Sequence, residues 1–127
     1  MDIGMKTLKI SAIYMVAGLV LGLLMGISGN FALTSVHAHG LLLGWATMAL
    51  AGFVYILLPE CGRSRLAKAH FWGHNAGLPL MMAGLGLHVY GVEAAAPLVP
   101  VSSILVLVSL VLFAINLFLN GRAGRQA

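Results

Sequence analysis

Two histidines that lie two residues apart, His37 and His39, are the residues of this sequence best suited to chemistry. They stand at the start of a long apolar run, and a neutral imidazole is a common ligand for iron, copper and zinc. A helix turns by about 100° per residue, so the two side chains would point to nearly opposite sides. They cannot easily share one ion, but each can serve a different one. The pair therefore predicts a helix that lies between two cofactor pockets.

The residues expected on the same side as His37 are small. Gly40, Gly44 and Ala51 follow it at intervals of 3, 7 and 14 residues, whereas the side of His39 carries bulkier apolar residues. A side of small residues leaves either room for a flat ligand or a close contact with another helix. Gly40 and Gly44 are therefore candidate cofactor-binding positions beside the two histidines.

Three further histidines share one stripe of a second helix. His70 and His74 are four residues apart, and His88 follows His70 by about five helical turns. If this helix crosses a bilayer core about 30 Å thick, His88 lies at a depth similar to that of His37 and His39, and the other two lie near the opposite surface. His88 is thus a candidate further ligand at the first pair, and His70 with His74 is a separate candidate metal site.

The composition excludes an ordinary soluble fold. Of the 127 residues, 61% are hydrophobic and 8% are charged, against about a quarter charged in typical globular chains. A spanning helix needs roughly 20 mostly apolar residues, and four runs approach that length: 10–27, 36–58, 66–89 and 98–119. We predict one all-α domain over residues 1–127, a bundle of four transmembrane helices in a lipid bilayer.

The positive charges follow the four predicted spans. Threading the spans places every lysine and arginine on one side of the membrane: Lys6, Lys9, Arg63, Arg65, Lys68, Arg122 and Arg125. The positive-inside rule then puts both termini and the middle loop in the cytoplasm. These residues do not cluster on one face, so nucleic acid is not an expected partner. The first span has an apolar core of about 18 residues, longer than that of a secretory signal, and we expect it to be retained.

The remaining polar and small residues predict packing rather than chemistry. Ser109 and Asn116 are the notable polar residues of the last run and are expected to form hydrogen bonds between helices. Cys61 is the only cysteine, lies at the cytoplasmic end of the second run, and is expected to be an ordinary unreactive thiol. The first run carries small residues at four-residue intervals, which favour close helix packing: Gly18, Gly22 and Gly26.

Two stretches together resemble a known family. The motifs H-A-H-G at 37–40, L-L-G-W at 42–45 and Y-I-L-L-P at 55–59 resemble the tenth helix of the catalytic subunit of haem–copper oxidases. The motif A-K-A-H-F-W at 67–72, followed by Asn75, His88 and Gly91, resembles the eleventh helix. The resemblance covers about residues 36–91, with the motifs in the same order. The cbb-type oxidases and the nitric-oxide reductases are the more similar branches.

The resemblance implies a cofactor and an assembly. In the family, the first histidine of the pair ligates the active-site haem and the second ligates the low-spin haem, which would make His37 and His39 axial ligands of haem b. The family's subunit has twelve helices in three similar quartets, and this chain resembles one quartet. A homotrimer would rebuild the ring, with each pocket receiving His37 from one chain and His39 from its neighbour. The resemblance further implies a bacterial-type inner (cytoplasmic) membrane and a quinol or cytochrome as electron donor.

Departures from the family pattern narrow the expected activity. The family's copper site needs three histidines, including a His-Tyr motif that is absent from this sequence. The outer loops contain no arginine to hold haem propionates, and the predicted spans contain no carboxylate for a proton channel. Full oxygen reduction is therefore not expected. The expected function is electron transfer or the binding of a small gas, oxygen or nitric oxide, and whether the protein is an oxidoreductase stays open.

Two other classes of function remain open at this point. The chain could be a membrane module that binds or transports copper through His70, His74 and its seven methionines, although most of these methionines are not clustered. It could instead be an assembly protein without a cofactor, whose histidines serve only structure. Bound copper without porphyrin would indicate the former, and a colourless protein the latter.

Overall fold

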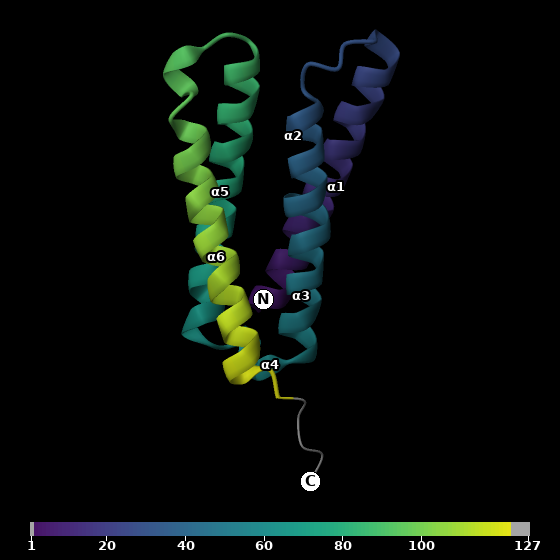
Figure 1. The fold of residues 1–127 in the computed structure, drawn as a ribbon. Coiled ribbons are helices and arrows are strands. Elements are labelled where there is room, and N and C mark those ends of the chain that lie inside the picture. Colours follow the sequence, from purple (N-terminus) through teal and green to yellow (C-terminus); the bar gives the residue numbers. More distant parts are fainter. Residues whose placement is uncertain (1, 123–127) are drawn as a thin grey trace.

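The computed structural model describes residues 2–122 and consists of helices joined by short connections (Figure 1). No β-strand occurs within this range. The elements are α1 (Ile3–Ser28), α2 (Thr34–His39), η1 (Gly40–Thr47), α3 (Met48–Leu57), α4 (Pro59–Gly62), α5 (Arg65–Val89), η2 (Glu93–Ala95) and α6 (Leu98–Asn120). The segments α2, η1 and α3 form one continuous long helix, of which η1 is π-helical.

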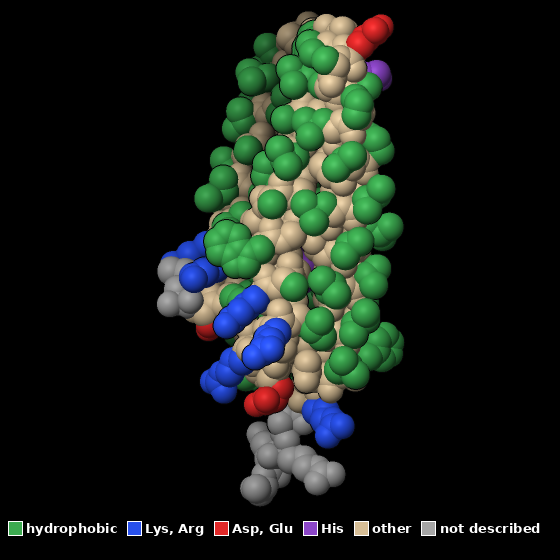
Figure 2. All heavy atoms as spheres, turned by 90° about the vertical axis from the view of Figure 1, so that its left-hand side faces the viewer, with side chains coloured by type: hydrophobic (Ala, Val, Ile, Leu, Met, Phe, Trp, Pro, Cys, Tyr) green, Lys and Arg blue, Asp and Glu red, His purple; other side chains and the backbone are tan. Residues whose placement is uncertain are grey.

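The long helices form two antiparallel hairpins. In Figure 1, α1 pairs with the continuous helix α2–η1–α3, and α5 pairs with α6. The short helix α4 joins the two hairpins at the end of the molecule where the first and last helices also have their free ends. We call this the basic end, because the lysine and arginine side chains gather there (Figure 2). Of the predicted positive residues, Arg125 lies outside the described range.

Three helical segments are long and apolar enough to cross a membrane: Ile3–Ser28, Thr34–Leu57 and Glu93–Asn120. The prediction of an all-helical membrane protein is confirmed at this level. The helix α5 is not among the three, because its three histidines and Asn75 lower the hydropathy of its sequence. The helix α5 does occupy the third predicted run, 66–89, but its role as a membrane span, and with it the count of four spans, stays a prediction.

The distribution of side chains is inverted relative to that of a soluble protein. Large apolar side chains cover the outside (Figure 2), with Ile27 75% and Phe118 90% exposed. The buried side chains include many polar ones: Thr7, Ser11, His70, His74, Ser102, Ser109 and Asn116. Apolar surface of this extent is stable only against lipid or another apolar partner, and buried polar groups in such a chain must find partners inside it.

Local signals explain where the helices begin and end. Asp2 caps α1 by accepting a hydrogen bond from the Met5 N–H at 2.8 Å, and Ser64 caps α5 by accepting one from the Ala67 N–H at 3.0 Å. Gly29 ends α1 with a φ of 69°, a left-handed conformation that costs glycine little. These caps satisfy helix-terminal groups and confine the bends to short connections.

The two polar residues singled out in the last run behave differently. Asn116 donates from Nδ2 to the Cys61 carbonyl at 3.0 Å, so the expected bond between separate helices is confirmed and joins α6 to α4. Ser109 instead donates to the Leu105 carbonyl of its own helix at 2.7 Å, so the prediction for this residue was wrong. A serine hydroxyl can donate to a carbonyl of the preceding turn, so a serine in a helix does not need a partner on a neighbouring helix.

Glycines set how closely α1 approaches the second long helix. A Cβ added at Gly52 would lie 3.0 Å from the Gly4 carbonyl oxygen and 3.0 Å from the Leu8 nitrogen, both main-chain atoms. In the predicted set of small residues, Gly18 receives Leu41 and Gly22 receives His37, whereas nothing lies within 4 Å of a Cβ at Gly26. Close packing therefore uses two of these three glycines.

We expect Gly52→Ala to destabilise the protein by about 1–3 kcal/mol, because main-chain atoms cannot move aside for the new methyl group. The matched control is Gly26→Ala, which adds the same methyl group to a helix in open space. It should leave stability unchanged or raise it slightly. Equilibrium unfolding in mixed micelles measures both. Equal losses for the two variants would contradict the close α1–α3 contact.

Candidate functional site

The imidazole of His37 is held between two helices. Its Nδ1 lies 2.8 Å from the carbonyl oxygen of Gly18 in α1, and the half-buried ring packs against Gly22, where a Cβ would come within 2.6 Å of Cε1. A carbonyl oxygen can only accept, so Nδ1 carries the proton and donates it. The other nitrogen, Nε2, then bears a lone pair in the neutral ring.

The imidazole of His39 is held in the same manner by its own helix. Its Nδ1 donates to the Ser35 carbonyl oxygen at 2.7 Å, and the side chain is half-buried. Its Nε2 also bears a lone pair as a result. Within residues 2–122, neither Nε2 has a hydrogen-bond partner. Metal-ligating histidines characteristically donate their second ring N–H to a carbonyl or carboxylate, and both residues of the pair meet this condition.

The space beside Gly40 and Gly44 is filled within the chain. A Cβ at Gly40 would lie 3.2 Å from Cε of Met82 in α5, and one at Gly44 would collide with the Tyr14 ring of α1. The sequence left open whether this side holds a flat ligand or makes a close contact with another helix. Within a single chain, the structure has the close helix contact. The two glycines thus contact different helices, Gly40 meeting α5 and Gly44 meeting α1.

An apolar groove lies just before the start of the second long helix, at the end of the molecule opposite the basic end. It has a volume of about 330 Å³ and is bounded by α1, the start of the second helix and the end of α5. Its lining is mainly apolar: Leu21, Leu24, Met25, Ile27, Ser28, Asn30, Leu33 and Tyr90. Leu33 lies four residues before His37, so the groove is about one helical turn from the imidazole.

His70 and His74 belong to a buried chain of hydrogen bonds. The Tyr55 hydroxyl lies 2.8 Å from His70 Nδ1, His70 Nε2 lies 3.2 Å from His74 Nδ1, and His74 Nε2 lies 3.0 Å from the Leu43 carbonyl oxygen. Both histidines are 1% exposed. All four of their ring nitrogens therefore have partners, which leaves none free for a metal ion.

The candidate residues do not assemble into one centre. His88 is exposed near the end of α5, away from the buried pair on the same helix. Within residues 2–122, no group of three or more histidine, cysteine or acidic side chains could hold a metal ion. His37 and His39 each keep an Nε2 without a hydrogen-bond partner, so both can still bind a metal ion.

Sequence reasoning missed the role of Tyr55. The spacing of His70 and His74 placed them correctly on one face, but it did not show that a tyrosine 15 residues earlier would meet them. The feature of the sequence that could have revealed this role is a phenol near the end of an apolar run, one turn before Pro59. A buried phenol generally needs a partner, and the histidines were the nearest candidates on a neighbouring helix.

The fold and the apolar exterior define an all-helical protein of the membrane type. Neither a protein-family model, nor a curated protein, nor a solved structure matches the chain. The function of this protein must therefore be inferred from its own residues.

The hydrogen bonds predict a tautomer for each histidine. His37 and His39 should carry the proton on Nδ1, and His70 and His74 should carry it on Nε2. The reason is that each series of hydrogen bonds ends at a carbonyl oxygen, which can only accept. The ¹⁵N spectrum of histidine-labelled protein in bilayers measures this, with resonances assigned by single His→Gln variants. An Nε2–H signal from either His37 or His39 would contradict the arrangement of the pair.

Proposed function

We propose that this protein binds haem b in the membrane and that His37 and His39 would hold it through Nε2. The observation that carries the proposal is that the Nδ1 atoms of both histidines donate to main-chain carbonyls, at 2.8 and 2.7 Å. Such a bond fixes the ring orientation and makes the opposite nitrogen a better ligand. The resemblance of residues 36–91 to the haem–copper oxidase subunit supports the same assignment.

A haem fits this site at an interface between chains better than inside one chain. The side of Gly40 and Gly44 is occupied by Met82 and Tyr14, so it offers no slot for a porphyrin. The groove that Leu33 lines, about one helical turn before His37, is apolar, as a porphyrin requires, but its 330 Å³ is at the lower end for a ligand pocket, about 300–1,000 Å³. A second copy would supply the remaining wall, and a homotrimer would bring His37 of one chain toward His39 of the next.

The proposed activity is electron transfer or the binding of oxygen or nitric oxide. A haem iron held by both histidines would supply one-electron chemistry, and one held by a single histidine would supply a coordination position for such a gas. The Gly18 and Ser35 carbonyls orient the two imidazoles. We further propose four spans with both termini cytoplasmic in a bacterial-type inner membrane, and a quinol or cytochrome as electron donor. The gathering of basic residues at one end supports this orientation.

Copper transport has less support from the geometry. It would use His70 and His74, whose ring nitrogens are all engaged in hydrogen bonds. An assembly protein without a cofactor would be colourless after reconstitution with haem b, and the following experiment distinguishes it from a haem protein.

We expect the purified protein, supplied with haem b, to show a Soret band that His39→Ala abolishes or strongly reduces. This variant is informative because His39 hydrogen-bonds only its own helix, so its loss leaves the contacts between helices intact. His37→Ala should have the same effect on the Soret band. His88→Ala, which removes an exposed histidine, is the matched control and should bind haem normally. A Soret band unchanged in both His37→Ala and His39→Ala would refute the assignment.

We also expect the haem-loaded protein to be a homotrimer. The physical reason is that the opposed directions of His37 and His39 need a different neighbour on each side of one helix. Native mass spectrometry from detergent or nanodiscs gives the mass and the number of haems per assembly. A haem-binding monomer would contradict both the trimer and the proposal that one haem is held by His37 of one chain and His39 of the next.

A further inference from the structure

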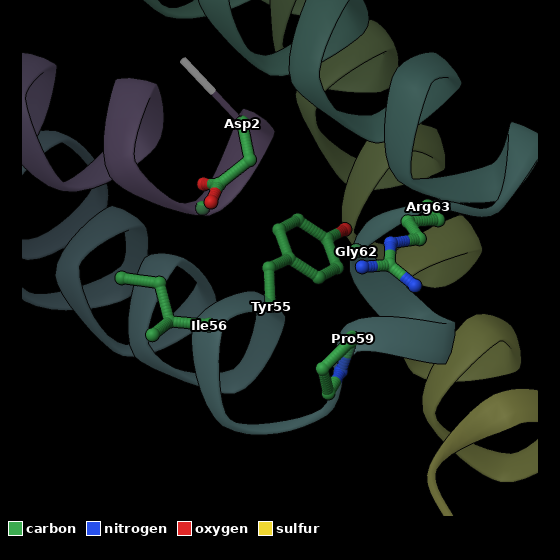
Figure 3. Close-up of a pocket in the computed structure, with 7 residues that line it drawn as sticks. Asp2, Tyr55, Ile56, Pro59, Gly62 and Arg63 are labelled. Carbon is green, nitrogen blue, oxygen red and sulfur yellow. The ribbon is translucent and has the colours of Figure 1, made fainter.

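A pocket opens at the basic end beside Tyr55 (Figure 3). It has a volume of about 150 Å³, and its lining includes Asp2 from the start of α1, Tyr55 from α3 and Arg63 after α4. In Figure 3 the Tyr55 ring lies between Asp2 and Arg63, with Gly62 and Pro59 beside it. A single water needs only about 10–15 Å³ of such space, so this polar pocket has room for several water molecules.

Beyond the pocket, the hydrogen bonds of the buried chain have one direction. The Leu43 carbonyl can only accept, so His74 donates to it from Nε2 and accepts at Nδ1. His70 must then donate from Nε2 to His74 and accept at Nδ1, which leaves the Tyr55 hydroxyl as the donor to His70. Every member of the chain thus points its proton away from the basic end and toward η1.

We propose that Tyr55, His70 and His74 form a relay that takes up one proton from the pocket at the basic end and holds it at His74. This inference goes beyond the proposed function and does not require haem.

The transfer needs no oxidant and no rotation of a side chain. A hydronium ion in the pocket gives a proton to the Tyr55 oxygen, whose own proton passes to His70 Nδ1. The proton on His70 Nε2 then passes to His74 Nδ1, and His74 becomes an imidazolium that still donates from Nε2 to the Leu43 carbonyl. One O–H or N–H bond forms for each that breaks. The net result is one proton gained and one water molecule left in the pocket.

Burial of the pair disfavours an imidazolium, since both rings are 1% exposed, and the Leu43 carbonyl that accepts from His74 is the group that offsets part of this cost. From α6, the Phe113 ring packs against His70, with 5.2 Å between the ring centroids. Asn116 of α6 also lies beside the Tyr55 hydroxyl and does not titrate. The two imidazole centroids are 5.3 Å apart, so a second proton would meet strong repulsion in this interior.

The other titratable groups near the relay are few. They are the Cys61 thiol of α4, which is buried near Tyr55, and the Tyr14 phenol of α1, which packs against the apolar cluster of Leu78 and Met81. Asp2 and Arg63 also titrate, and they line the pocket at the basic end. Within residues 2–122, no carboxylate hydrogen-bonds either histidine, so the Leu43 carbonyl is the acceptor that holds the proton in place.

The test is the exchange of the imidazole N–H protons with D₂O, followed by ¹⁵N NMR of histidine-labelled full-length protein in bilayers. In the wild type, the His70 and His74 signals should exchange through the Tyr55 hydroxyl. Tyr55→Phe keeps the ring and removes the entry point, so both imidazoles must exchange through rarer openings of the buried chain. We expect this exchange to slow by about tenfold, the factor that corresponds to breaking one buried hydrogen bond.

The matched control is Tyr14→Phe, which removes a tyrosine hydroxyl outside the relay and should leave the exchange of both histidines unchanged. Amide exchange in α3 and α5 serves as the internal reference for opening of the bundle. Slowing of the imidazole signals in Tyr55→Phe at unchanged amide exchange supports the relay. The relay is overturned if the imidazoles of Tyr55→Phe exchange at the wild-type rate. It is also overturned if imidazole exchange follows amide exchange in every variant. A colourless protein in the haem experiment would leave this result unaffected.

Discussion

The main-chain carbonyl is the hydrogen-bond acceptor on which the polar interior of this protein depends. In hydrocarbon there is no water to satisfy a buried polar group, so each one must find a partner inside the chain. Among the described residues, no buried side-chain nitrogen or oxygen lacks one. The carbonyls of Gly18, Ser35, Leu43 and Cys61 bind His37, His39, His74 and Asn116 respectively.

A carbonyl acceptor also determines where each proton is. Because it cannot donate, it fixes the tautomer of the imidazole that binds it, and the effect extends to any second ring in the chain. The same rule thus has opposite consequences in two parts of the molecule. It leaves Nε2 of His37 and of His39 free for a ligand, and it occupies both nitrogens of His70 and of His74. Chemistry that needs an open coordination position and chemistry that needs a continuous proton path are therefore separated in space.

Close helix packing makes these acceptors reachable. The carbonyl of Gly18 can meet His37 because Gly18 and Gly22 carry no side chain that would keep the imidazole away from α1. The approach of Gly4 to Gly52 holds the opposite end of the same hairpin together. In lipid, where no hydrophobic drive brings helices together, such contacts between small residues supply much of the association energy. The α1 hairpin therefore both stabilises the fold and orients the candidate ligand.

The sequence alone determined the helical segments, the apolar exterior and the common face of His70 and His74, because these follow from composition and from the local period of a helix. The direction of His37 away from His39 has the same local origin. Only the tertiary structure decided that Met82 and Tyr14 fill the space beside Gly40 and Gly44, and that Tyr55 meets His70. These contacts join residues far apart in the chain, and they depend on helix register. The π-helical segment η1 changed that register between His39 and Met48 in a manner that an α-helical period could not predict.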